Sequence, residues 1–130
     1  MDIFKIGKTN FGIGEVTLNI NEERGIITDL AITANQQMFD AISEDEDGDW
    51  NWALYPPKIY FRGLHYKKSA EKIKIDITDV LLDECDIALY FMEHFDVYGK
   101  LVITKNLVEI NGEVEISGEN YPLEIVAKAK

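Results

Sequence analysis

Apolar and polar residues alternate with a period of two over most of the chain, which predicts a mainly β fold. The clearest run is residues 72–77, where Ile73, Ile75 and Ile77 alternate with charged residues, as in a half-buried strand. Residues 12–20 alternate in the same way, with an irregularity at Gly14 and Glu15. A polar turn then leads into residues 26–34, so we expect these two segments to form an antiparallel hairpin.

After Pro56 and Pro57, the sequence predicts a strand over residues 58–66. It begins only there because proline cannot donate a hydrogen bond to a sheet.

The C-terminal part of the chain predicts a β-meander. Further short apolar runs cover residues 100–104, 107–110, 114–116 and 123–126. Asn111 and Gly112 lie between two of these runs, and this dipeptide predicts a type I′ hairpin turn because both residues tolerate a positive φ.

Helix signals are few. Thr78 and Asp79 suit the start of a short helix over residues 80–85, whereas residues 36–42 are too short for a definite helix and predict one turn or a packed loop. Residues 86–94 fit both a strand and an extended helical stripe, of which we favour the strand.

These segments together predict one α+β domain, mainly β, over the 130 residues. We expect an antiparallel sheet that is either curled or folded into a two-layer β-sandwich, with one or two short helices.

Charge indicates the class of partner. The chain has 24 acidic and 13 basic residues and a net charge of -11, which argues against binding nucleic acid or an anionic membrane and favours a basic protein. The first twenty residues contain no apolar run of signal-peptide or membrane-span length, so we expect a cytoplasmic protein. Cys85 is the only cysteine, which excludes an intrachain disulfide and a cysteine metal cluster.

Acidic and basic residues fall into blocks along the chain. Residues 25–57 and 75–98 each contain seven acids and no lysine or arginine, while residues 58–74 contain six bases and one acid. Two explanations are open. Neighbouring strands can pair opposite charges across the sheet, or the two acidic blocks can meet on one face and steer a basic partner.

The first acidic block runs directly into an aromatic segment, which makes it the leading candidate for a binding site. Like charges this close repel each other, so the acids should lie in a solvated loop, with aromatic residues beside them as an apolar anchor. Trp52 and Tyr60 are favoured for the core. The candidate partner-binding residues are Asp45, Glu46, Asp47, Asp49, Trp50, Trp52 and Tyr55, together with Asp79, Asp83, Glu84 and Asp86 of the second block.

No motif predicts catalysis, so we expect a protein that is not an enzyme and has no cofactor. Asp45, Asp47 and Asp49 resemble the opening of a calcium-binding EF-hand loop, but Trp50 stands where the turn glycine is needed and Pro56 where the bidentate glutamate is needed. We therefore predict no metal site. The sequence also lacks a glycine-rich phosphate loop and a nucleophile elbow.

A small acidic chain with an acid-rich loop leading into Asp49-Trp50-Asn51-Trp52 and residues 55–61 resembles, in general character, the immunity proteins of bacterial toxin systems such as contact-dependent inhibition and type VI secretion. The resemblance implies a non-enzymatic inhibitor that binds and blocks one cognate toxin, often a basic nuclease. Two alternatives stay open. One is a small ligand- or metal-binding β domain that uses His65 or His94, and the other is an assembly subunit that forms homo-oligomers by pairing a free sheet edge.

Overall fold

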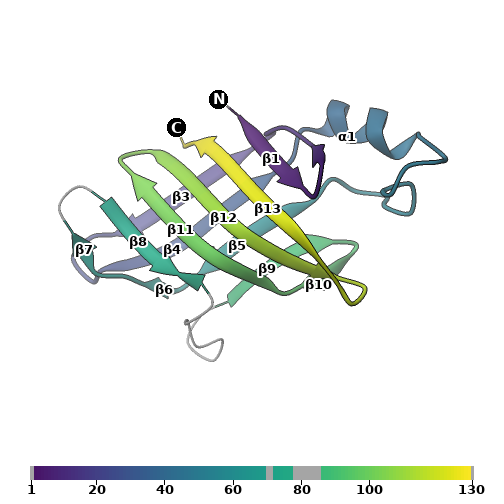
Figure 1. Cartoon of the computed structure of the whole chain (residues 1–130). Coiled ribbons are helices and arrows are strands. Elements are labelled where there is room, and N and C mark those ends of the chain that lie inside the picture. Colours follow the sequence, from purple (N-terminus) through teal and green to yellow (C-terminus); the bar gives the residue numbers. More distant parts are fainter. Residues whose placement is uncertain (1, 70–71, 78–85, 130) are drawn as a thin grey trace.

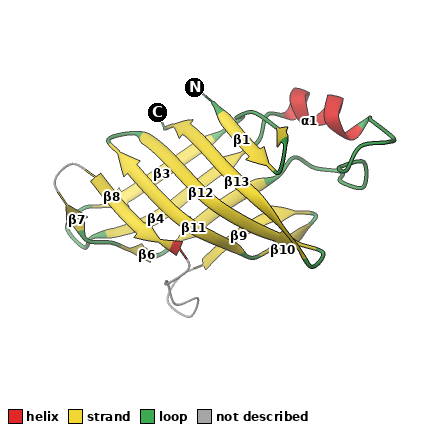
Figure 2. Ribbon diagram, viewed as in Figure 1, coloured by secondary structure: helices red, strands yellow, loops and turns green. Residues whose placement is uncertain are grey.

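The chain folds into two antiparallel β-sheets that pack face to face, as the computed structural model shows (Figure 1). The structure describes residues 2–69, 72–77 and 86–129. In Figure 2, strands dominate and helix α1 (Gln36–Ser43) lies at one end of the molecule. This confirms the mainly β prediction. Of the two sheet arrangements left open by the sequence, the structure has the two-layer one.

The first sheet contains seven strands in the order β2-β1-β13-β12-β11-β8-β7. The strands are β1 (Ile3–Ile6), β2 (Thr9–Asn10), β7 (Lys68–Ser69), β8 (Lys72–Asp76), β11 (Val97–Thr104), β12 (Leu107–Ile116) and β13 (Glu119–Lys128). The three longest strands form the predicted meander at its centre. Because β1 pairs with β13, the two ends of the described chain lie together (Figure 1).

The second sheet has the order β10-β9-β5-β4-β3, and β6 also pairs with β4. The strands are β3 (Val16–Asn21), β4 (Ile26–Thr33), β5 (Lys58–Arg62), β6 (Leu64–His65), β9 (Asp86–Phe91) and β10 (Glu93–Phe95). The β3–β4 hairpin agrees with the prediction. The predicted strand over residues 12–20 begins later than expected, at Val16. The predicted strand over residues 58–66 is interrupted at Gly63, which has a φ of 70°.

Alternate residues of both sheets face each other and form one apolar core. In β1, for example, the fully buried Phe4 and Ile6 alternate with the partly exposed Ile3 and Lys5. None of the described buried side chains is polar or charged. The period-two pattern of the sequence therefore reports which face of each strand is inside.

The predicted hairpin turn at Asn111-Gly112 is wrong, because both residues lie inside β12. Gly112 pairs with Gly99 of β11 on one side and with Leu123 of β13 on the other. A Cβ atom on Gly112 would collide with the carbonyl oxygen of Tyr98 and lie 2.7 Å from the Cα of Gly99. Glycine at 112 therefore permits the close approach of two strands and does not form a turn.

The turns of the meander lie elsewhere. Between β12 and β13, Ser117 and Gly118 have φ values of 54° and 80°, and two positive values in a two-residue loop are the mark of a type I′ turn. Between β11 and β12, Lys105 has a φ of 57°.

The strand prediction for residues 86–94 is confirmed, but the segment contains a turn. Phe91 of β9 pairs with Glu93 of β10, so Met92 alone connects the two strands. Its φ of 71° is a left-handed value that few residues other than glycine adopt. The turn therefore fixes the direction in which Glu93 and the rest of β10 leave β9.

Residues 36–42, which the sequence left open between one helical turn and a loop, belong to helix α1 (Gln36–Ser43). Asn35 caps its start, because the Asn35 side-chain oxygen accepts a hydrogen bond of 2.9 Å from the backbone N–H of Met38. Phe39 is the helix residue that is buried in the core. The helix predicted over residues 80–85 lies outside the described residues.

Candidate functional site

One end of the sandwich gathers α1, the segment of residues 44–57 that follows it, and the β9–β10 and β12–β13 turns (Figure 1). An open cleft is lined by side chains from residues 44–57, from the β9–β10 segment and from the β12–β13 turn, so these three segments are neighbours. The lining residues are Trp52, Met92, Glu93, Phe95 and Ser117. We call residues 44–49 the acidic loop and the exposed side chains Trp52, Leu54 and Tyr55 the apolar patch.

Trp50 fastens the acidic loop to the core. Its side chain is only 4% exposed and lies among aromatic rings, with centroids 5.8 Å from Phe11, 5.6 Å from Phe91 and 5.6 Å from Tyr121. The indole N–H donates a hydrogen bond of 2.9 Å to the Thr9 hydroxyl oxygen, which satisfies its polar atom inside the protein. Trp50 therefore supports the loop from below and cannot be an exposed contact for a partner.

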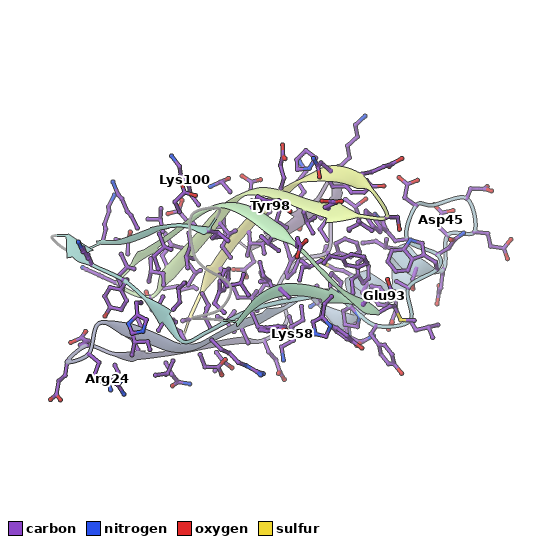
Figure 3. The ribbon with its side chains drawn as sticks, turned by 90° about the horizontal axis from the view of Figure 1, so that it is seen from below. Arg24, Asp45, Lys58, Glu93, Tyr98 and Lys100 are labelled. Atoms are coloured by element: carbon purple, nitrogen blue, oxygen red, sulfur yellow. The ribbon has the colours of Figure 1, made fainter. Side chains whose placement is uncertain are left out.

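Hydrogen bonds within the acidic loop hold its shape. Asp45 accepts one from the backbone N–H of Asp47 at its carboxylate (3.1 Å) and one from that of Gly48 at its carbonyl (3.0 Å). The Asn51 side chain donates to the carbonyl of Glu46 at 2.6 Å. The carboxylates themselves are exposed, as predicted, and Figure 3 shows Asp45 extending from the end of the molecule on which Glu93 lies.

The residues of the apolar patch are unusually exposed for their type. Trp52 is 42%, Leu54 69% and Tyr55 59% exposed. The Trp52 indole N–H donates to the carbonyl of Asp49 at 2.9 Å, which fixes the ring beside the acidic loop. The prediction that Trp52 lies in the core is therefore wrong, and the two tryptophans have exchanged roles. Tyr60 is also outside the core, because it alternates with buried Ile59 and Phe61 and lies on the opposite face of β5.

The two explanations for the charge blocks apply to different parts of the molecule. On the first sheet, strand register places Asp76 opposite Lys100 and Glu124 opposite Lys5, as expected for cross-strand charge pairing. The acidic loop differs. Asp45, Glu46, Asp47 and Asp49 form no ion pair within the part of the chain that the structure describes.

Three of the four partner-binding candidates in the second acidic block, Asp79, Asp83 and Glu84, lie outside the described residues. Asp86 begins β9, where its backbone pairs with that of Arg62 on β5. The predicted site residues whose positions can be described therefore come mainly from the first block, while Glu93 of the second block lines the cleft.

Tyr121 reports the negative potential at this end of the sandwich. Its hydroxyl donates a hydrogen bond of 2.9 Å to the Glu119 carboxylate, and this bond raises the pKa of Tyr121 above the usual 10.0. Partial desolvation and the charges of Glu119 and Asp49 raise the pKa further, because each of them disfavours the phenolate.

We expect Glu119→Gln to lower the pKa of Tyr121 more than Asp49→Asn does, because the Glu119 hydrogen bond is the largest cause of the shift. The raised pKa stabilises the fold at pH values below the usual one, and this contribution is lost as the pH rises through the raised value. Tyrosinate absorbance can be titrated in each protein, with Tyr121→Phe as the reference that isolates this residue. A normal pKa in the unchanged protein would contradict the proposed contact.

Several functional candidates could not be found from the sequence. Met92, Glu93 and Phe95 reach the cleft from the β9–β10 segment, far from Trp52 in the chain. Apart from the place of Glu93 in the second acidic block, nothing in their local pattern marks them. Leu54 lies in the aromatic-rich segment that follows the acidic loop but is a common core residue type, so its exposure has no sequence signal. The contact between the backbone N–H of Leu54 and the Met92 sulfur, at 3.4 Å, links the two segments.

The histidines occupy different surroundings. His94 lies in β10 with its ring 5.1 Å from Tyr90 and 6.1 Å from Tyr60, whereas His65 is an exposed residue of β6. Within the described ranges, no group of three or more His, Cys, Asp and Glu side chains is arranged to hold a metal ion.

The free edge of β3 bears on the third alternative. β3 pairs with β4 on one side and with no other described strand, and it contains no charged residue. Neutral edge strands can pair with another chain. Its neighbours Glu15, Glu22 and Glu23 would repel the same residues of a second copy in an antiparallel pair.

Comparisons with protein-family models, curated proteins and solved structures gave no match. None of the helices in the described part of the chain is long and apolar enough to cross a membrane.

Proposed function

We propose that this chain is a non-enzymatic cytoplasmic protein that binds a basic protein partner through the acidic loop and the apolar patch. Its general character suggests the role of an immunity protein that binds and blocks one cognate toxin. The observation that carries the proposal is the combination, at one end of a sandwich, of exposed apolar side chains with carboxylates that form no ion pair with any described residue.

The two parts of the site have different physical roles. Exposed carboxylates attract a basic protein over distances of about 10 Å at moderate salt, so they act mainly on the rate of association. Large apolar side chains lose contact with water only in the bound complex, so they act mainly on dissociation. Isolated exposed apolar residues are ordinary, but three large apolar side chains within four positions beside a fixed loop are typical of an interface.

The acidic loop is also prepared for binding. Its internal hydrogen bonds and the buried Trp50 hold the carboxylates in place before a partner arrives. A fixed loop loses little conformational entropy on binding, and this favours affinity.

The test is to replace Asp45, Glu46, Asp47 and Asp49 together with the matching amides. We expect association with the partner to slow by about tenfold or more at low salt, and its dependence on salt to weaken, while the fold stays intact. Stopped-flow mixing at low and high salt measures both effects. If a toxin gene adjoins the gene for this chain, its toxin domain is the partner to use.

A matched control removes the same number of charges elsewhere. Glu22, Glu23, Glu113 and Glu115 are all exposed and lie outside the acidic loop and the cleft, so changing them to glutamine should leave most of the association rate in place. Equal slowing by both quadruple variants would mean that net charge, and not the acidic loop, attracts the partner. Unchanged rates in the loop variant would contradict the proposed site.

A further inference from the structure

We infer that the cleft beside the acidic loop binds an arginine side chain of the basic partner. This inference rests on the proposed function, because it names the chemical group that the same site would recognise. The cleft has a volume of about 410 Å³ and is open to solvent. Pockets that hold small groups begin at about 300 Å³, so one long side chain fits.

The lining combines an apolar wall with a carboxylate. Trp52, Met92 and Phe95 supply the apolar surface, Glu93 supplies the charge, and Ser117 closes the side formed by the β12–β13 turn. Glu93 is exposed and has no ion-pair partner among the described residues. A ligand that complements this lining needs an apolar stem and a cationic head.

Both sides of the cleft are held in position. The Trp52 ring packs 5.0 Å from Phe91 and 6.2 Å from Trp50, and its N–H is bonded to the carbonyl of Asp49. Glu93 follows the one-residue turn at Met92 and pairs with Phe91. Phe91 therefore packs against the Trp52 ring and pairs with Glu93 in the sheet. These two contacts fix the positions of Trp52 and Glu93 relative to each other.

Arginine fits this site better than lysine. A guanidinium is planar and weakly hydrated, so it stacks on an indole face and offers several N–H donors to a carboxylate at the same time. A lysine ammonium is a compact and strongly hydrated charge, which loses more hydration beside an apolar wall. The negative loop next to the cleft adds attraction for either cation but does not distinguish them.

The experiment uses N-acetyl-arginine methylamide as a probe of the full chain. The two indole N–H signals are followed by NMR and assigned with a Trp52→Phe variant. We expect saturable shifts of the Trp52 signal with a dissociation constant on the order of 1 mM, the value typical of so small a ligand. The neutral isostere N-acetyl-citrulline methylamide should bind at least about tenfold more weakly, because it lacks the cation.

Variants connect the binding to the cleft. Glu93→Gln should weaken arginine binding by about fivefold or more, while Glu113→Gln, an exposed acid of β12, should change it less than twofold. N-acetyl-lysine methylamide is titrated in the same way. The inference is overturned if the citrulline or the lysine derivative binds as tightly as the arginine derivative, or if the Trp52 signal does not move.

The outcome is separate from that of the proposed function because no partner protein is needed. If arginine binds but neutralising the acidic loop leaves partner association unchanged, the cleft assignment stands and the loop proposal fails. If the loop variant slows association but the arginine probe does not bind, only the cleft assignment fails.

Discussion

Replacing Gly112 with alanine is expected to destabilise the protein by about 2–4 kcal/mol, a large effect for the addition of one methyl group. The new Cβ atom would collide with the Tyr98 carbonyl and meet the Cα of Gly99 at 2.7 Å. Both obstacles are backbone atoms of β11, so a side-chain rotation cannot relieve the contact. The central strands of the first sheet would have to separate.

Gly118→Ala is the matched control. Gly118 lies in the β12–β13 turn with a φ of 80° and has no atom within 4 Å of an added Cβ. The control therefore suffers only the backbone cost of a left-handed residue, about 1–2 kcal/mol. Urea unfolding of the two variants measures the difference. If Gly112→Ala costs no more than Gly118→Ala, residue 112 lies in a turn and the register of β12 is wrong.

The fate of the Asn111-Gly112 prediction shows where sequence reasoning succeeds and where it fails. Alternation identified the strands because each sheet buries one face, and burial acts on every second residue. The requirement for glycine at 112 comes from Gly99, thirteen residues earlier, and no local pattern contains that information. The true turn at Ser117 and Gly118 carries a weaker turn signal than Asn-Gly, so the stronger local signal led to the wrong position.

The candidate site, too, was only partly predictable from the sequence. The exposure of Asp45 to Asp49 followed directly from charge repulsion. The roles of Trp50 and Trp52 did not, because both are large aromatic residues two positions apart. Their roles depend on Phe11, Thr9 and Phe91, which surround Trp50 from distant parts of the chain.

Because Trp50 is buried and Trp52 is exposed, we expect Trp50 to matter more for stability and Trp52 to matter more for binding. Trp50→Ala should destabilise the fold by about 3–5 kcal/mol, because it removes a buried ring and leaves the Thr9 hydroxyl without its donor. Trp52→Ala removes a ring that is 42% exposed, so we expect a cost of about 1 kcal/mol. Thermal or urea unfolding of both variants measures these costs.

Binding to the partner should show the reverse order. Trp52→Ala is expected to speed dissociation from a basic partner by about thirtyfold, which corresponds to the roughly 2 kcal/mol of an interface hot spot. Trp50→Phe keeps most of the buried ring, so this variant should stay folded and dissociate at nearly the original rate. The two tryptophans then separate support of the loop from contact with the partner. Faster dissociation in Trp50→Phe than in Trp52→Ala would mean that the partner reads the shape of the acidic loop, and that the apolar patch is not the anchor.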